Sequence, residues 1–219
     1  MTRIVIFAKA PLPGFAKTRL IPALGEQGAA ELARRMLLHT VTQALAAGLG
    51  PVELCVTPSM RETVWRSLSI PAGVAWSEQG NGDLGKRMAR AAQRSIAAGD
   101  SVLLVGSDCP AVDAALLRRA DISLERFDAT LVPTADGGYI VLGLKQFHVS
   151  VFESIQWSSD GVAAATLERC ERLGWKLETH ATLHDIDEPA DLHWVDRQWL
   201  ESVPEHAPMH PIQRNSRVG

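Results

Sequence analysis

The sequence lacks the features of a secreted, membrane-spanning or nucleic-acid-binding protein. Its 219 residues include only three cysteines, and 22 basic residues stand against 25 acidic ones. An odd cysteine count without CxxC spacing argues against a disulfide framework or a zinc ribbon, and the balanced charge argues against a nucleic-acid partner. The first apolar run, Ile4–Ala8, is too short for a signal sequence or a membrane span. We therefore expect a soluble, cytoplasmic protein.

Short β-branched runs alternate with amphipathic stretches along the chain, which is typical of βαβ units. The predicted strands are Ile4–Ala8, Val52–Val56, Ser101–Val105, Ala129–Val132, Tyr139–Leu144 and Lys176–Thr179. The predicted helices cover residues 27–47, 62–68, 84–98, 111–120 and 162–173, and a last one begins at Glu188-Pro189.

The fourth and fifth predicted strands are separated by residues 133–138, too few for a helical crossover. We expect these two strands to form either a hairpin or an irregular corner, so the sheet should be mixed but mainly parallel. The prediction is one α/β domain over residues 1–200, a three-layer α/β/α sandwich. Residues 201–219 are expected to form a mobile tail.

The connection after the first predicted strand is long and basic. Residues 9–20 carry Lys9, Lys17 and Arg19, and two prolines and Gly14 stiffen the segment. Ligands of open α/β sheets bind beyond the carboxyl ends of the strands, where this segment should lie. Three cations there suit a diphosphate or triphosphate. The alternative is a solvated basic loop without a ligand.

Two acidic motifs follow later strands. Asp108 comes directly after a predicted strand, and Asp185 and Asp187 share one side of an extended segment near the end of the domain. Carboxylates beside phosphate-binding cations commonly hold Mg²⁺ or Mn²⁺, with phosphate oxygens and waters as the remaining ligands. The alternative for Asp108 is an N-cap of the helix predicted at residues 111–120.

Two glycine-containing motifs offer further polar groups. Asp136-Gly137-Gly138 lies between two strands, where it could approach a ligand closely or form an ordinary Asp-Gly turn. Residues 79–88 form a glycine-rich turn into a helix and include Asp83, a segment suited to contacting a base or ribose. Asp160 precedes another helix, and we interpret it as a helix cap.

Several of these motifs, in this order, resemble the DUF2064 family. That family is similar to the GT-A-fold nucleotide-diphospho-sugar transferases and is often labelled a glycosyltransferase. The resemblance covers roughly residues 2–195. Two of its motifs, Lys17-Thr18-Arg19-Leu20 and the Asp-x-Asp-x-Pro run that begins at Asp185, also resemble the 2-phospho-L-lactate guanylyltransferases. The resemblance to DUF2064 rests on the runs Phe7–Leu20, Gly82–Met88, Gly106–Pro110, Asp136–Tyr139 and Asp185–Leu192.

The resemblance implies a Rossmann-like GT-A fold and a divalent metal, Mg²⁺ or Mn²⁺. It also implies a nucleotide-sugar or nucleoside triphosphate as donor and a small-molecule acceptor. By resemblance, Asp108 and Asp187 match the metal-side acids, and Lys9, Lys17 and Arg19 match the phosphate-binding loop.

The same motifs supply the remaining expected contacts. We expect Gly14, Asp83 and Ser107 to contact the nucleotide, together with the loop cations. Lys17 and Asp136 are the expected catalytic residues. Asp136 would act as the general base near an acceptor hydroxyl, because glycosyl transfer with inversion needs one.

Glycosyl transfer from a nucleotide-sugar to an unidentified acceptor is the preferred function. The second hypothesis is a nucleotidyltransferase that joins a nucleoside triphosphate to a phosphorylated small molecule. The third is a nucleotide-binding module without turnover. The sequence lacks the Gly-Gly-x-Ser-x-Arg-Met-Gly loop of typical sugar nucleotidyltransferases, and it has Ser107-Asp108-Cys109 where many glycosyltransferases have Asp-x-Asp.

Overall fold

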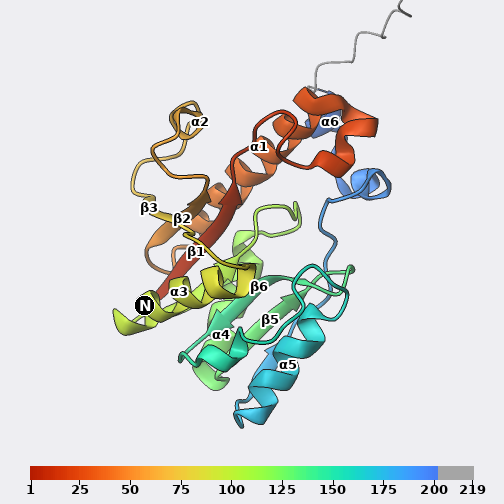
Figure 1. Ribbon diagram of the computed structural model, residues 1–219. Coiled ribbons are helices and arrows are strands. Elements are labelled where there is room, and N and C mark those ends of the chain that lie inside the picture. Colours follow the sequence, from red (N-terminus) through yellow and green to blue (C-terminus); the bar gives the residue numbers. More distant parts are fainter. Residues whose placement is uncertain (202–219) are drawn as a thin grey trace, which may run out of the picture.

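Seven strands form one mixed sheet in the computed structural model, which describes residues 1–201 (Figure 1). Their order across the sheet is β3-β2-β1-β4-β6-β5-β7. The expected mobile tail falls almost entirely outside the described residues. The strands are β1 (Thr2–Lys9), β2 (Val52–Thr57), β3 (Ala75–Glu78), β4 (Ser101–Val105), β5 (Ala129–Pro133), β6 (Tyr139–Leu144) and β7 (Leu177–Thr179).

The sheet is mainly parallel, as the alternation of strands and helices predicts. Strand β1 pairs in parallel with β2 and β4, and β2 pairs in parallel with β3. Strand β6 is antiparallel to both of its neighbours, β4 and β5, and β7 is parallel to β5. Of the two possibilities for β5 and β6, the hairpin is therefore the one present, with a register irregularity at Val132/Pro133.

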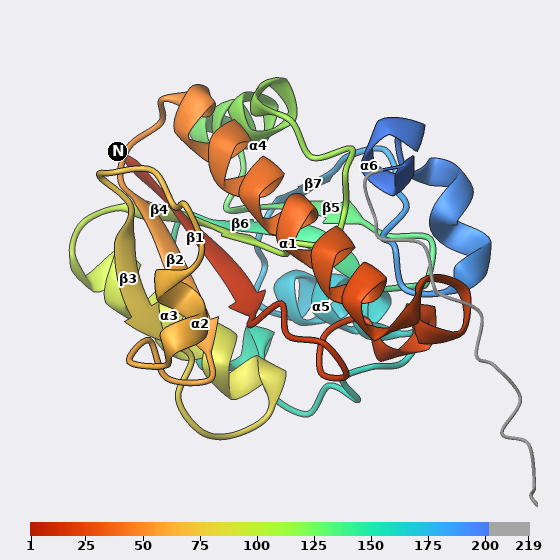
Figure 2. The ribbon, with the colours of Figure 1, turned by 90° about the horizontal axis from the view of Figure 1, so that it is seen from above.

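Helices cover both faces of the sheet. Helices α1 and α4 lie on one face and α3 and α5 on the other, which gives the predicted three layers (Figure 2). Within the described residues no helix is long and apolar enough to cross a membrane. The α-helices are α1 (Ile21–Ala47), α2 (Thr63–Arg66), α3 (Leu84–Ala97), α4 (Ala114–Arg126), α5 (Val162–Arg172) and α6 (Arg197–Glu201). The 3₁₀ turns are η1 (Thr18–Leu20), η2 (Val149–Val151) and η3 (Pro189–Trp194).

The sequence of strand β1 is almost continuously apolar because both of its faces are buried. Successive side chains of a strand point to opposite faces of the sheet. Ile4 and Ile6 therefore join the core under α1 and α4, whereas Val5 joins the core under α3 and α5. All three side chains are fully buried, as expected for a strand in a sheet covered on both faces.

Two boundaries differ from the sequence-based expectation. Helix α1 spans Ile21–Ala47, but Gly25 is non-helical (φ 69°, ψ 171°) and kinks it, so its continuous part starts close to the expected residue 27. The helix expected at residues 111–120 runs instead over Ala114–Arg126. The last predicted helix is the 3₁₀ turn η3, with a proline in its first turn.

Asp113 caps α4. Its side chain accepts a hydrogen bond from the backbone N–H of Leu116 at 2.6 Å. The alternative that Asp108 caps this helix is therefore wrong, and the Asp108 carboxylate is available for other interactions.

Candidate functional site

Two adjoining cavities lie beyond the carboxyl ends of β1 and β4, where an open α/β sheet binds its ligands. They have volumes of about 510 Å³ and about 360 Å³, and we call them the larger and the smaller cavity. Arg19, Asp108 and Asp187 line both cavities. The larger cavity is further lined by Asp136, Trp157, Asp160 and Asp185, and the smaller by Lys9, Phe15, Lys17 and Ser107.

Lys17 joins the two acidic motifs at the border between the cavities. Its Nζ lies 3.1 Å from Oδ2 of Asp108 and 3.0 Å from Oδ1 of Asp187. The side chain is only 11% exposed. Burial lowers the pKa of Lys17, but the charges of the two carboxylates and their hydrogen bonds raise it above its ordinary value. Lys17 is therefore a largely buried cation that is charged at neutral pH.

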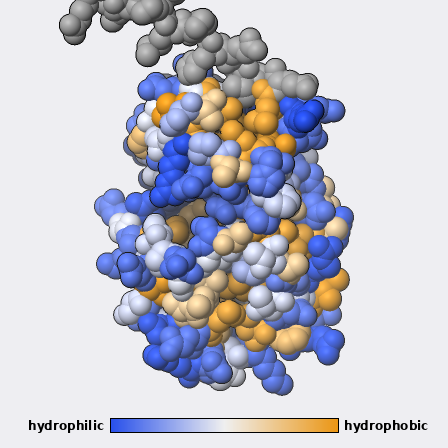
Figure 3. Space-filling model, turned by 90° about the vertical axis from the view of Figure 1, so that its right-hand side faces the viewer, coloured by the Kyte–Doolittle hydropathy of each residue, from blue (hydrophilic) through white to orange (hydrophobic). Residues whose placement is uncertain are grey.

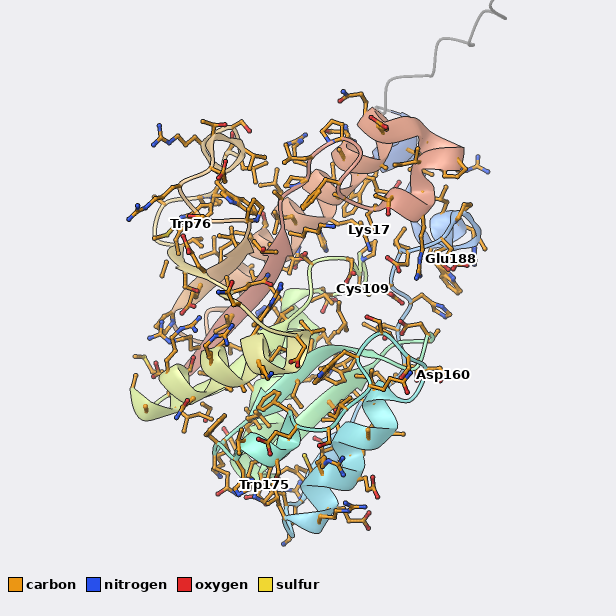
Figure 4. The ribbon with its side chains drawn as sticks, viewed as in Figure 1. Lys17, Trp76, Cys109, Asp160, Trp175 and Glu188 are labelled. Carbon is orange, nitrogen blue, oxygen red and sulfur yellow. The ribbon has the colours of Figure 1, made fainter. Side chains whose placement is uncertain are left out.

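The other two cations of the loop are more exposed. Nη1 of Arg19 lies 3.1 Å from Oδ2 of Asp187 and 3.8 Å from Glu188. Nζ of Lys9 lies 4.1 Å from the centre of the Phe15 ring, a cation–π contact. All three predicted cations thus border the smaller cavity. In Figure 4, Lys17 lies near Glu188, whereas Asp160 lies at the opposite side of the site.

The remaining predicted nucleotide contacts divide into two groups. Ser107 lines the smaller cavity next to Asp108. Gly14 lines neither cavity, although it takes a left-handed conformation (φ +70°) in the turn that carries Phe15, which does line the smaller one. Asp83 also lines neither cavity. Its side chain caps α3 by accepting a hydrogen bond from the backbone N–H of Lys86 at 2.8 Å. The structure therefore does not bring Asp83 to the other predicted site residues.

The two acids expected to bind a metal fit a divalent cation. Both carboxylates already share one positively charged nitrogen, so they converge on a common point, Asp108 from the end of β4 and Asp187 from the segment before η3. Their donor atoms are oxygens, which Mg²⁺ and Mn²⁺ prefer. Within residues 1–201 no three His, Cys, Asp or Glu side chains form a metal site by themselves. Phosphate oxygens and waters would have to complete the coordination of such an ion.

Asp136 borders the larger cavity at the corner between β5 and β6. Its Oδ1 accepts hydrogen bonds from the Thr134 hydroxyl at 2.6 Å and from the backbone N–H of Gly138 at 2.9 Å. The predicted Asp-Gly turn is thus present and also fixes the carboxylate at the cavity. The two readings of this motif, a turn and a ligand contact, are compatible.

Asp185 and Asp187 both line the larger cavity, while Ile186 between them is fully buried. This is the shared side that the sequence predicts for the two carboxylates. Burial, followed by the negative charges of Asp108 and Asp136, raises the pKa of Asp185 to about 6. The site therefore carries an excess of negative charge on this side.

Asp160 and Trp157 are also site residues. The sequence offers Asp160 as an alternative to Asp136 for the general base but favours a helix cap, and the cap is wrong, because Gly161 is the N-cap of α5 and no side chain caps that helix. Asp160 instead lines the larger cavity, as does Trp157. Only the position of this loop between a strand hairpin and a helix could have indicated their place.

The family described as "Uncharacterized protein conserved in bacteria (DUF2064)" matches residues 40–159, more than half of the chain. The chain belongs to the DUF2064 family. The match includes Ser107, Asp108 and Asp136, whereas Lys17 and Asp187 lie outside it. The DUF2064 motif expected from the sequence is thus confirmed, and the two ends of the site extend beyond the matched range.

Solved structures place this DUF2064 chain among nucleotide-utilising transferase folds. A candidate nucleotide-diphospho-sugar transferase from Desulfovibrio desulfuricans G20 is 30% identical with a TM-score of 0.83, over 92% of this chain and 88% of that one. A nucleotidyl transferase from Methanothermobacter is 18% identical with a TM-score of 0.62, over 92% and 98% of the two chains. A 4-diphosphocytidyl-2C-methyl-D-erythritol synthase from Anaerococcus prevotii is 11% identical with a TM-score of 0.60, over 89% and 93%. None of the curated protein sequences compared with the DUF2064 chain matches it.

Proposed function

We propose that this DUF2064 protein is a metal-dependent glycosyltransferase that moves a sugar from a nucleotide-sugar to a small-molecule acceptor. The observation that carries the proposal is the border between the cavities, where Lys17, Asp108 and Asp187 meet. A cation-lined cavity on one side suits the diphosphate, and a carboxylate-lined cavity on the other suits the transferred group and its acceptor. The similarity to the Desulfovibrio protein supports this choice.

The loop cations hold the donor in this proposal. Lys17 and Arg19 donate hydrogen bonds to diphosphate oxygens, which are better partners for a charged donor than neutral acceptors are. As the bond to the sugar breaks, negative charge develops on the departing diphosphate, and fixed cations stabilise that charge. A Mg²⁺ or Mn²⁺ ion held by Asp108 and Asp187 supplies further positive charge there.

Asp136 accepts the proton of the acceptor hydroxyl. Two hydrogen bonds to its Oδ1 fix the carboxylate at the larger cavity. A general base must lie within about 3 Å of the proton that it removes, directly or through one water. Asp160 is the competing base, since its carboxylate also lines this cavity and caps no helix.

A nucleotidyl transfer is the second candidate. The fold of the Methanothermobacter nucleotidyl transferase supports it, because the same arrangement of strands serves that protein. In this reaction a substrate phosphate attacks the α-phosphate of a nucleoside triphosphate, and pyrophosphate leaves. Lys17 and Arg19 would then contact the triphosphate rather than a sugar diphosphate.

The product that the protein releases distinguishes glycosyl transfer from nucleotidyl transfer and from binding without turnover. The protein is incubated with nucleotide-sugars, and separately with nucleoside triphosphates plus sugar phosphates, each with Mn²⁺. Anion-exchange chromatography then detects nucleoside diphosphate or pyrophosphate. We expect slow release of nucleoside diphosphate from at least one nucleotide-sugar, through hydrolysis when no acceptor is present. Release of pyrophosphate alone would contradict glycosyl transfer and support the second candidate, and nucleotide binding without either product would leave a binding module.

A further inference from the structure

The larger cavity differs from the smaller one in charge. Five carboxylates line it, and among the described residues Arg19 supplies its one positive side chain. Arg19 already pairs with Asp187, and Lys17 pairs with Asp108 and Asp187. None of the ion pairs within residues 1–201 involves Asp136, Asp160 or Asp185, so three of the five aspartates that line this cavity form no salt bridge among the described residues.

An aromatic side chain forms part of the apolar wall of the larger cavity. Trp157 lies against Gly85 at the start of α3, where a Cβ atom would approach Cζ2 and Nε1 of the indole to 2.6 Å. Only glycine leaves room for the ring in this position. Figure 3 shows that this side of the molecule is hollowed and that mostly hydrophilic residues border the hollow.

A second glycine brings the backbone next to Asp136 close to the backbone of Asp160. Gly137 has a positive φ of 87°, and a Cβ atom there would overlap the carbonyl oxygen of Asp160. The backbone N–H of Ala163 donates a hydrogen bond to the Gly137 carbonyl at 2.9 Å. The corner that carries Asp136 is therefore held against the start of α5, and Asp136 and Asp160 line neighbouring parts of the same cavity.

We infer that the larger cavity binds an uncharged polyhydroxylated ring, such as a hexose, and that Asp136 and Asp160 exclude a phosphate group from it. Carboxylates accept hydrogen bonds from hydroxyl groups, and an aromatic ring packs against the C–H face of a sugar. A phosphate in the same space would meet unpaired charges of its own sign, which is how a site rejects a wrong ligand. The inference rests on the proposed function and names its substrate class.

Pairs of free and phosphorylated sugars test this assignment. Glucose, galactose, mannose and N-acetylglucosamine are each compared with their 6-phosphates by ligand-observed saturation-transfer NMR. The full chain is used with Mg²⁺ and a saturating nucleoside diphosphate that it has been shown to bind. We expect at least one free sugar to bind, and its 6-phosphate to bind at least tenfold more weakly.

A double variant tests the role of the two carboxylates. Asp136→Asn combined with Asp160→Asn should reduce the discrimination against the 6-phosphate to less than about threefold. The matched control combines Glu125→Gln with Glu171→Gln, two exposed residues of α4 and α5, and removes the same charge away from the cavity. It should keep the full discrimination. Circular dichroism verifies that both variants are folded.

The outcomes distinguish this inference from the proposed function. Equal or tighter binding of the 6-phosphate, unchanged discrimination in the double variant, or binding of no free sugar to the nucleotide-bound protein would each overturn the inference. Failure of every nucleoside diphosphate to bind, measured beforehand by calorimetry, would instead overturn the proposed function.

Discussion

The Nζ of Lys17 lies 3.0 Å from Oδ1 of Asp187, although 170 residues separate them in the chain. This contact ties the loop after β1 to the segment that precedes η3. The same ammonium also lies 3.1 Å from Oδ2 of Asp108, so one positive charge lies between carboxylates from two distant segments of the chain. Its removal leaves these two negative charges facing each other, with Arg19 still paired with Asp187.

Replacing Lys17 should therefore destabilise the metal-free protein. The two carboxylates are 38% and 45% exposed, so solvent screens part of their repulsion, and we expect Lys17→Met to cost about 1 kcal/mol. For a chain of this size that corresponds to a fall in Tm of about 2–4 °C. Mn²⁺ should raise the Tm of this variant more than that of the wild type, because the ion and the ammonium share the same ligands.

Thermal denaturation with EDTA and with Mn²⁺ measures both effects. Lys176→Met is the matched control, since that side chain is exposed and lies outside both cavities. An unchanged Tm in Lys17→Met, with the same response to Mn²⁺ as the wild type, would show that the ammonium does not offset the two carboxylates.

Arg19 should contribute to diphosphate binding but not to nucleoside binding. Hydrogen bonds to charged groups contribute about 1.5–3 kcal/mol. Arg19→Ala should therefore lower the affinity for a nucleoside diphosphate by roughly ten- to a hundredfold. Isothermal titration calorimetry with a nucleoside diphosphate and its parent nucleoside measures the difference. Arg66→Ala, on the exposed surface of α2, is the control. Equal losses for both ligands would make the loop a structural element only.

Asp136 should act on turnover rather than on nucleotide affinity. We expect Asp136→Asn to lower turnover at least about a hundredfold, the loss usual for a general base, while the Kd for the nucleotide stays within about twofold. Asp160→Asn should lower turnover less. The reverse order of the two effects would identify Asp160 as the base, and loss of nucleotide binding in Asp136→Asn would make that residue a donor contact.

Asp185 should make the metal-free protein less stable as the pH rises. Its pKa of about 6 in the folded chain lies above the ordinary value for an aspartate, so the folded state binds its proton more tightly than the unfolded state does. The stability that this group contributes is present at low pH and is lost between about pH 4 and pH 6. Asp185→Asn cannot ionise and should avoid this loss.

The comparison is made as a difference in Tm between Asp185→Asn and wild type in EDTA, from pH 4 to pH 7.5. The difference should grow in favour of the variant up to about pH 6 and then level off. A difference in Tm that does not change with pH would show that the pKa of Asp185 is not raised in the folded protein.

The sequence predicts the sheet well because buried strands leave a strong signal. Val52–Val56 and Ser101–Val105 are rich in buried apolar residues, and both lie in strands of the parallel half. Strand β3, over Ala75–Glu78, lies at the edge of the sheet with its side chains partly or fully exposed. Its sequence therefore carries little hydrophobic pattern, and it was not predicted.

Only part of the site can be predicted from the sequence, because the roles of some aspartates depend on the path of the backbone. Motifs at strand ends predict that Lys17, Asp108 and Asp187 meet, because the carboxyl ends of parallel strands share one edge. Local chemistry does not reveal which of several aspartates caps a helix. Asp83 caps α3 whereas Asp160 caps nothing, and only the path of the backbone distinguishes them.

Metal-dependent nucleotide binding tests the central claim most directly. Calorimetric titrations of a panel of nucleoside diphosphates and triphosphates, with and without Mn²⁺, are compared for the wild type and Asp108→Asn. We expect Mn²⁺ to strengthen nucleotide binding by the wild type at least tenfold, and to have no such effect on the folded variant. Undiminished Mn²⁺-dependent affinity in Asp108→Asn would contradict the assignment of this carboxylate, and with it the metal-assisted transfer site between the two cavities.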